Sequence, residues 1–390
     1  MKAARKRHAV MPIVLACALA ACVAPPRATL APMPAPTLAP SAPRPWLIAH
    51  RGASAHRPEH TLAAYALAID QGADAIEPAL VMTRDGVLVA RHENELSDTT
   101  DVSQRPEFAA RRTRRQVDGA WAHGWFSEDF TLAELKTLRV RERLPQLRST
   151  QWDGQFELAT FAEIVALVAG RSAALGRPIG LVPEIKHPSH FAARGLAMEQ
   201  PLLNALAAHA YTRRAPVFIQ SFETANLRAL RRQLPRDGNI RLLQLIGPPH
   251  QQPHDAVLAG EGVTYAQMVR PEGLRNIATY ADAIGPAYRL LELQPCEGGG
   301  HRSALVDAAH AAGLRVIVYT FRPENYFLEE RFRSAAGPAA RNEDGAVREM
   351  QAAVSAGVDG VFADDPAMAR RALSAWPSAP DLFVGSAAGR

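Results

Sequence analysis

Short apolar runs alternate with amphipathic helical patterns from Trp46 almost to the end of the chain. Nine runs have the length and composition of buried strands: 47–50, 75–82, 87–92, 179–185, 217–221, 242–246, 281–284, 314–320 and 360–363. Helical patterns lie between them, and several end at a glycine, which is a typical helix stop; examples are Gly72, Gly170, Gly313 and Gly357. This alternation is typical of βα units that build a parallel sheet.

Nine candidate strands are one more than a closed eight-stranded barrel needs. The run 281–284 is among the shortest, and we predict that it lies outside the barrel. No internal linker divides the body, so the sequence predicts one α/β domain, a (β/α)8 TIM barrel over residues 46–375. The pattern lengthens over 93–179, which we interpret as an insertion after the third strand. Residues 376–390 are expected to form a C-terminal tail.

The insertion contains a basic cluster and an aromatic stretch. Its members are Arg105, Arg111, Arg112, Arg114 and Arg115, followed by Trp121, Trp125 and Phe126. A run of charges is usually a solvated face, so we expect a solvated helix here rather than a recognition patch. Contact with lipid headgroups is the alternative.

The first 22 residues have the features of an export signal. A basic stretch from Lys2 to His8 precedes an apolar run over 9–21 that is too short to span a bilayer as a helix. Leu19-Ala20-Ala21-Cys22 matches a bacterial lipobox, in which a cysteine is lipidated and becomes the new N-terminus. We therefore expect 1–21 to be removed as a signal peptide and the lipid on Cys22 to anchor the protein. An ordinary secretory signal is the alternative.

Residues 22–45 are expected to form a tether between the lipid and the folded body. Eight prolines stand among alanine and threonine, at 25, 26, 32, 34, 36, 40, 43 and 45, and this composition favours extended polyproline II. Val23, rather than an acidic residue, follows Cys22, which favours an exported lipoprotein of the periplasm that is anchored in the outer membrane. Cys296 is the one cysteine of the body, so an intramolecular disulfide is not expected.

The net charge argues against nucleic acid as a partner. The formal charge is +5, but four basic residues and no acidic ones lie in the signal, which leaves 5 − 4 = +1 for the rest. A nearly neutral body lacks the basic surface that phosphate backbones require. No nucleic-acid partner is therefore predicted.

Polar residues interrupt or follow four of the apolar runs. In a parallel barrel the functional groups gather at the carboxyl ends of the strands, so these positions are the informative ones. They are His50-Arg51-Gly52, Glu77, His92-Glu93-Asn94 and Glu184-Ile185-Lys186. We expect two imidazoles, a guanidinium, two carboxylates and an ammonium to meet at one mouth.

This set of groups suits phosphodiester cleavage. The reaction needs cations for the phosphoryl oxygens, a base for the attacking oxygen and an acid for the leaving alkoxide, and histidine exchanges protons near neutral pH. Arg51 can bind the phosphate in a planar fork, while Glu77 and Glu184 can hold a hard divalent ion. A single histidine or glutamate at a strand end is usually structural, so the inference depends on their joint placement.

The order of the motifs resembles that of the glycerophosphodiester phosphodiesterases over residues 46–370, most closely the exported, periplasmic type. The matching segments are His50-Arg51-Gly52, Pro58-Glu59-His60-Thr61, residues 77–86, His92-Glu93-Asn94, Glu184-Ile185-Lys186, Gln220-Ser221-Phe222, Tyr319-Thr320 and residues 357–364. The resemblance implies a TIM barrel that binds Ca²⁺ or Mg²⁺. It also implies hydrolysis of glycerophosphodiesters, such as glycerophosphocholine, to glycerol 3-phosphate and an alcohol.

The same resemblance implies a role for seven residues. It gives His50 and His92 the acid and base roles, Arg51 and Lys186 the phosphate, Glu59 the support of the first histidine loop, and Glu77 and Glu184 the metal.

One position departs from the family pattern. The second strand of these enzymes reads Glu-x-Asp, and both carboxylates face the metal because residues two apart on a strand point the same way. Here the Asp position is Ala79. A methyl group cannot coordinate a cation, and the affinity of such a site follows its ligand charge, so we expect weakened metal binding and low activity.

Two other functions stay open on the same fold. Ala79 would also suit a catalytically impaired, lipid-anchored protein that binds glycerophosphodiesters or another ligand without cleaving them. The long insertion would alternatively suit a phospholipase-D-like lyase that acts on lysophospholipids. Gain of activity in Ala79→Asp would indicate the first, and a cyclic product the second.

Overall fold

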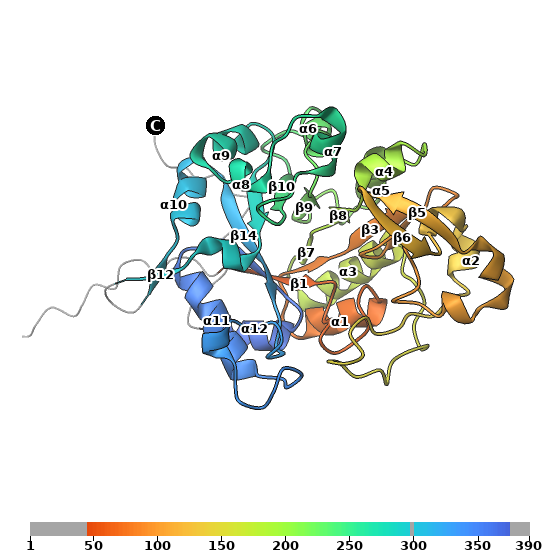
Figure 1. Cartoon of the computed structure of the whole chain (residues 1–390), viewed down its shortest axis with the longest axis horizontal. Coiled ribbons are helices and arrows are strands. Elements are labelled where there is room, and N and C mark those ends of the chain that lie inside the picture. The colour runs from red at the N-terminus through yellow and green to blue at the C-terminus, as the bar shows by residue number, and fades with distance from the viewer. Residues whose placement is uncertain (1–44, 297–299, 375–390) are drawn as a thin grey trace, which may run out of the picture. The chain divides into compact units, whose positions relative to one another are not determined.

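Eight parallel strands close into a barrel in the structure, a computed structural model that describes residues 45–296 and 300–374 (Figure 1). Two barrel strands are each split in two at a proline, Pro78 or Pro183, which has no N–H to donate to the ladder. In order around the barrel they are β1 (Trp46–His50), β2 and β3 (Ala75–Glu77, Ala79–Met82), β7 and β8 (Gly180–Leu181, Glu184–Ile185), β9 (Val217–Ser221), β10 (Ile240–Ile246), β11 (Ala283–Pro286), β14 (Arg315–Phe321) and β15 (Gly360–Ala363). The pairing of β15 with β1 closes the ring.

The prediction of a TIM barrel is confirmed, but the choice of the surplus strand was wrong. The run predicted to lie outside contains β11, which pairs with β10 and β14 inside the barrel. The run 87–92 instead forms β4 (Leu88–Ala90), which pairs antiparallel with β3. Only five residues separate β3 from β4, and a parallel return would need a crossover of a dozen or more. The Asp85-Gly86 turn therefore makes a hairpin.

Helices pack around the barrel, as the alternation predicts (Figure 1). One of them differs from expectation: α3 passes through Gly170 and ends before Gly176, whose left-handed φ of 62° suits a helix end. The helices are α1 (Leu62–Asp70), α3 (Phe161–Leu175), α4 (Pro188–Ala192), α5 (Glu199–Ala208), α6 (Ala225–Arg231), α7 (His254–Ala259), α8 (Tyr265–Met268), α9 (Pro271–Ala278), α10 (Ala304–Ala311), α11 (Glu343–Ser355) and α12 (Pro366–Leu373).

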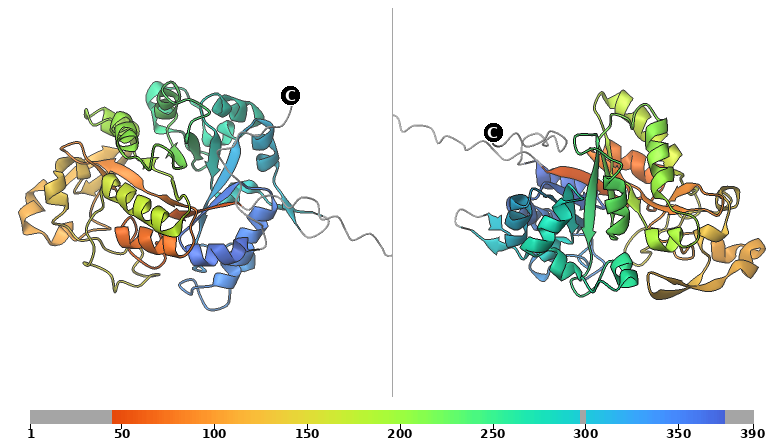
Figure 2. Two further views of the ribbon diagram at one scale, coloured as in Figure 1. Left: turned by 180° about the vertical axis from the view of Figure 1, so that it is seen from behind. Right: turned by 90° about the horizontal axis from the view of Figure 1, so that it is seen from above.

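The segment between β4 and α3 lies at one side of the barrel in all views (Figure 2). It contains the hairpin of β5 (Thr113–Val117) and β6 (Ala120–Gly124) and the short helix α2 (Leu132–Leu135). The helix expected for the basic cluster is therefore wrong. Asp118 and Gly119 both have positive φ, which makes a tight two-residue turn and brings β6 back along β5.

The arginines of this cluster are satisfied by the insertion itself. Arg105, Arg111 and Arg115 pair with acidic side chains of the insertion. The exposed Arg112 and Arg114 stack on the rings of Trp125 and Trp121. The expectation of a solvated face therefore holds only for Arg112 and Arg114, because the other three arginines are half-buried in ion pairs.

The barrel interior is filled by apolar side chains from the strands. This inner core consists of Trp46, Ile48, Ala75, Val182, Phe218, Leu243, Leu245, Ala283, Ile317 and Phe362, and a larger core lies between the strands and the helices. Within the described residues, no helix combines the length and apolarity needed to cross a bilayer. The predicted signal peptide, Cys22 with the tether up to residue 44, and the tail 376–390 lie outside the described residues.

The short antiparallel pair of β12 (Gln294–Pro295) and β13 (His301–Arg302) precedes α10. It takes no part in the barrel.

Candidate active site

The carboxyl ends of the first strands bring the predicted residues together. His50 at the end of β1 lies in register with Glu77 at the end of β2, and Ala79 lies in register with Glu184 on the next strand. A cavity of about 180 Å³ is lined by the predicted residues His50, Arg51, Glu59 and His92. Glu184 and Lys186 line a neighbouring cavity of about 660 Å³.

The turn after β1 fixes the direction of Arg51. Arg51 and Gly52 have φ values of 60° and 88°, and a Cβ on Gly52 would come within 2.8 Å of the Ala64 backbone. Only glycine suits such a position. The turn directs the backbone N–H of Arg51 to donate to Glu77 Oε2, at 3.2 Å.

His50 is held by a buried carboxylate. Its Nδ1 lies 2.6 Å from Asp364 Oδ1, and its Nε2 lies 3.8 Å from Glu77 Oε2. Burial and the charge of Arg51 lower the pKa of His50 to about 4, although Asp364 opposes this. His50 is therefore neutral near pH 7.

Asp364 is itself fixed by two arginines. Its Oδ2 accepts from Arg148 Nη2 at 2.6 Å and from Arg322 Nε at 3.0 Å. Burial would raise the pKa of this carboxyl, but the two guanidinium groups hold it well below its usual range. An ionised carboxylate can only accept, so the proton of His50 sits on Nδ1 and the lone pair of Nε2 is free.

His92 repeats this arrangement with other partners. Its Nδ1 lies 2.5 Å from Glu93 Oε1, and its Nε2 lies 3.4 Å from Lys186 Nζ. Burial, Arg51 and Lys186 together lower the pKa of His92 well below its usual range. Both imidazoles therefore have Nδ1 bound to a carboxylate and are neutral at neutral pH.

Glu59 holds the guanidinium of Arg51 in place. Its Oε2 accepts from Arg51 Nη1 at 2.8 Å, and its two oxygens also accept from Arg143 at 2.9 and 2.6 Å. The Nε of Arg51 is buried and has no hydrogen-bond partner among the described residues. Arg51 therefore lines the cavity and keeps one N–H without a partner among the described residues.

Glu77 and Glu184 form a buried carboxylate pair. Burial and the charge of Glu184 raise the pKa of Glu77 to about 8. Gln220 Nε2 donates to Glu77 Oε1 at 2.6 Å, and Lys186 Nζ donates to Glu184 Oε1 at 3.1 Å. Two carboxylates that destabilise each other's charge are stabilised by a cation between them.

The oxygen donors at Glu77 and Glu184 fit a hard divalent ion, but they supply less negative charge than a site with three carboxylates would. Gln220 Oε1 is buried without a partner within the described residues and is an oxygen of the right type. Ala79, which is buried in register with Glu184, adds no oxygen. In the described part of the chain, no three or more His, Cys, Asp or Glu side chains form a group that could hold a metal.

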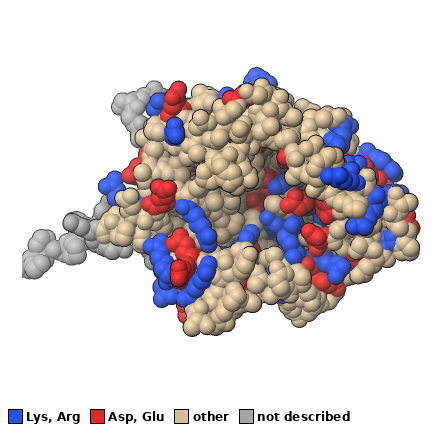
Figure 3. Space-filling view, viewed as in Figure 1, with Lys and Arg blue, Asp and Glu red and all other residues tan. Residues whose placement is uncertain are grey.

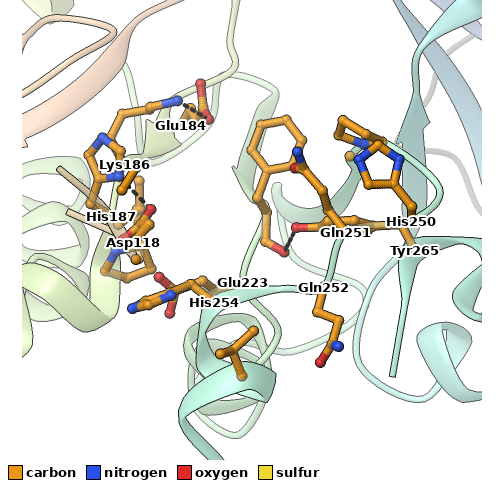
Figure 4. A pocket seen from close by; sticks show the side chains of 18 residues that line it. Asp118, Glu184, Lys186, His187, Glu223, His250, Gln251, Gln252, His254 and Tyr265 are labelled. Carbon is orange, nitrogen blue, oxygen red and sulfur yellow. Dashed lines mark hydrogen bonds and ion pairs between the residues drawn. The ribbon is translucent and has the colours of Figure 1, made fainter. Parts of the chain in front are cut away.

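The larger cavity lies beside this pair (Figure 4). One wall carries Glu184, Lys186, His187 and Asp118, and the opposite wall carries Tyr265 and the loop after β10. The face drawn in Figure 3 is hollowed near its centre, and acidic and basic side chains gather in the hollow. The cavity has room for more of a substrate than the phosphate alone.

Four residues around the histidines were not singled out from the sequence. Asp364 directly follows β15, one residue beyond the pairing of Ala363 with Ala49, and His50 ends β1 at the same level, so its position at a strand end was a usable signal. Arg143 and Arg148 come from the irregular insertion, and Arg322 follows β14; nothing in their local pattern marks them.

Comparisons with known proteins agree with this site. The sequence model of the Glycerophosphoryl diester phosphodiesterase family matches residues 50–368. A glycerophosphodiester phosphodiesterase of Arabidopsis thaliana is 32% identical over 337 residues, which cover 82% of this chain and 84% of the relative. The chain therefore belongs to the glycerophosphoryl diester phosphodiesterase family, a class of phosphodiester-hydrolysing enzymes.

Solved structures of related proteins share the fold. A putative glycerophosphoryl diester phosphodiesterase from Silicibacter pomeroyi is 24% identical, with a TM-score of 0.58 over 87% of this chain and 96% of that one. A phosphodiesterase from Oleispira antarctica, solved with the product sn-glycerol-3-phosphate, is 19% identical, with a TM-score of 0.55 over 85% of this chain and 97% of that one.

Proposed function

We propose that the protein hydrolyses small glycerophosphodiesters, such as glycerophosphocholine, to glycerol 3-phosphate and an alcohol. One observation carries the proposal: two neutral histidines, each bound to a carboxylate through Nδ1, both lie close enough to Arg51 for its charge to lower their pKa. A phosphodiester bound at Arg51 would lie within reach of both. The product bound to the Oleispira antarctica phosphodiesterase supports the same reaction.

The two histidines would exchange the protons of the reaction. Arg51 and Lys186 bind the phosphoryl oxygens, and the Nε2 of one histidine accepts the proton of the attacking oxygen. The other histidine, protonated at Nε2, returns a proton to the leaving alkoxide. The negative phosphate raises the pKa of both imidazoles when it binds, which makes protonation of one of them accessible near pH 7.

The resemblance to this family implies a divalent metal. Glu77 and Glu184 would hold Ca²⁺ or Mg²⁺, with the amide oxygen of Gln220 nearby. The ion would supply further positive charge for the phosphoryl oxygens. Because Ala79 replaces a third carboxylate, we propose that the affinity for the ion, and with it the activity, is reduced by at least 10-fold.

The test is release of glycerol 3-phosphate from glycerophosphocholine across a titration of Ca²⁺ and Mg²⁺. We expect slow turnover that saturates only at high metal concentration, and turnover at lower metal concentration in Ala79→Asp. His50→Ala and His92→Ala should be inactive although folded, as judged by circular dichroism. Full metal-stimulated activity in His50→Ala would overturn the proposal.

The same titration separates the proposal from the two alternatives. A wild-type protein that is inactive at every metal concentration, beside an active Ala79→Asp variant, would indicate a binding protein on an intact scaffold. Release of a cyclic phosphate from a lysophospholipid would indicate a lyase.

We also propose that the protein is an exported lipoprotein, anchored by lipid on Cys22 in the outer membrane. The lipobox and the proline-rich tether support this. We expect cells to incorporate labelled palmitate into the wild-type protein but not into Cys22→Ser. Labelling that persists in Cys22→Ser would contradict the lipid anchor.

A further inference from the structure

We propose that the β5–β6 hairpin of the insertion positions His92. In this arrangement Asp118, in the hairpin turn, holds His187, and His187 holds Glu93 against the imidazole of His92. The inference rests on the proposed function, since it concerns how one of the two proton-exchanging histidines is oriented. Asp118 and His187 are positioning residues.

Three contacts connect the hairpin turn to His92. Asp118 Oδ2 lies 2.6 Å from His187 Nδ1, a contact that Figure 4 shows at the wall of the large cavity. His187 Nε2 lies 3.7 Å from Glu93 Oε2, which is an ion-pair distance and too long for a hydrogen bond, and Nε2 has no other partner among the described residues. The other oxygen of Glu93 lies 2.5 Å from His92 Nδ1. Glu93 thus uses its two oxygens for two different imidazoles.

The backbone fixes both ends of the contact between the hairpin and the barrel. Asp118 and Gly119 have φ values of 46° and 82°, as a two-residue turn requires. His187 has a φ of 49° directly before Pro188, where α4 begins, and a residue other than glycine rarely adopts this conformation. Such an outlier beside a candidate active site points to a function for the side chain it directs.

The charges of the three groups support the contacts. Burial and Lys186 oppose protonation of His187, but Asp118 and Glu93 raise its pKa to about 9. His187 is therefore a cation at neutral pH, held between two carboxylates. Against the cost of its own burial, His187 and His92 hold the pKa of Glu93 well below its usual range, so Glu93 stays an acceptor for His92.

Glu93 needs this second contact because little else confines it. Its side chain is 41% exposed, whereas Asp364, the equivalent carboxylate at His50, is 3% exposed. An exposed glutamate has several rotamers, and only some of them reach His92 Nδ1. The cation at His187 selects these rotamers.

The first test compares Asp118→Asn and His187→Gln with wild type in the full chain. The control is Asp129→Asn, which makes the same chemical change in the insertion at nearly the same exposure, 30% against 32%, but contacts Arg115. We expect kcat to fall about 10-fold in Asp118→Asn and up to about 100-fold in His187→Gln, with KM changed less than threefold. The control should match wild type, and Asp118→Glu should recover part of the loss.

The pH profile distinguishes positioning from a structural role. The charged groups that face His92 are Glu93, Lys186 and Arg51, and those that face His187 are Asp118, Glu93 and Lys186. The titratable ring of His190 also packs edge-on against that of His187. If Glu93 is held less firmly, the apparent pKa that His92 contributes to the pH dependence of kcat changes. If the variants merely contain less folded enzyme, kcat falls by the same factor at every pH. A kcat profile of unchanged shape and height in both variants would overturn the inference.

Histidine NMR tests the inference without turnover. The ring ¹⁵N signals of His92, assigned with His92→Ala, should report a proton on Nδ1 in wild type and a mixture of tautomers in His187→Gln. If wild type shows no turnover but these signals change, the positioning holds and the proposed function fails. Signals of His92 that are identical in wild type, Asp118→Asn and His187→Gln would refute the positioning even if the enzyme is active.

Discussion

The two histidines at the mouth of the barrel are bound in the same way but in different surroundings. The side chain of His50 is 10% exposed and that of His92 is 25% exposed. Asp364, the partner of His50, lies between Arg148 and Arg322 in the interior. Glu93, the partner of His92, lies near the surface and contacts His187.

The insertion contributes a residue to the surroundings of each histidine, but the two residues differ in burial. At the His50 end it supplies Arg148, a buried ion-pair partner that also binds Glu324 and the backbone carbonyl of Ser54. At the His92 end it supplies Asp118 from an exposed hairpin turn. We infer that the first end is rigid and contributes to stability, and that the second can adjust at little cost to the fold.

The largest expected difference is in kcat, when Asp364 or Glu93 is replaced by the corresponding amide. In Asp364→Asn the amide oxygen must accept from Arg148 and Arg322, so its NH₂ faces His50 Nδ1 and forces the proton onto Nε2. A wrong tautomer of this kind costs up to about 10⁴-fold in kcat, and we expect at least about 10³-fold. In Glu93→Gln the exposed amide can keep its oxygen toward His92, so we expect only about 10- to 100-fold.

Steady-state kinetics with glycerophosphocholine measures both losses. Glu324→Gln, which changes another carboxylate that binds Arg148 but does not contact His50, is the control for disturbance of the ion-pair network. Equal losses in Asp364→Asn and Glu93→Gln would show that the two histidines are held equally firmly, which would contradict the expected difference.

The second prediction compares the free energy of unfolding when each end of the site loses an ion-pair partner. Arg148→Ala leaves Asp364 and Glu324 with a missing partner in the interior, and breaking a buried ion pair in this way costs about 3 to 5 kcal/mol. Asp118→Asn removes a partner from a pair that is partly exposed, which costs about 1 kcal/mol or less. Urea unfolding monitored by circular dichroism measures the free energy of unfolding of both variants, and similar values would contradict a rigid His50 end.

The sequence predicted the barrel and the two histidines, but not the residues that hold them. The alternation of runs gave the fold, and polar residues at strand ends gave His50, Glu77, His92 and Glu184. The surplus strand was misplaced because apolar runs of a hairpin and of a barrel strand have the same composition. The five-residue spacing and the Asp85-Gly86 turn carried the missing information.

The partners of the histidines could not be predicted in the same way. Arg148 and Asp364 are 216 residues apart, and Asp118 and His187 are 69 apart. Such contacts depend on how an irregular insertion folds over the barrel, and no local periodicity encodes that. The Asp118-Gly119 pair did mark a hairpin turn, but not the residue that the turn would reach.

The smallest effect concerns how stability depends on pH at the His92 end. Because the folded pKa of His187, about 9, lies above the ordinary value of 6.5, its protonation stabilises the fold fully below pH 6.5. This stability is lost as the pH rises from 6.5 to 9. After discounting for partial solvent access, we expect the free energy of unfolding to fall by about 1 to 2 kcal/mol over this range. His187→Gln removes this titrating group, so its unfolding free energy should decline less than that of wild type over this range. Glu77, whose pKa of about 8 lies in the same range, contributes a decline to both proteins. The decline should shrink in Asp118→Asn, which lacks one of the two carboxylates that raise the pKa, and persist in Asp129→Asn. An equal decline in wild type and His187→Gln would mean that His187 is not held as a cation between Asp118 and Glu93. The proposed electrostatic contact between His187 and Glu93 would then be wrong.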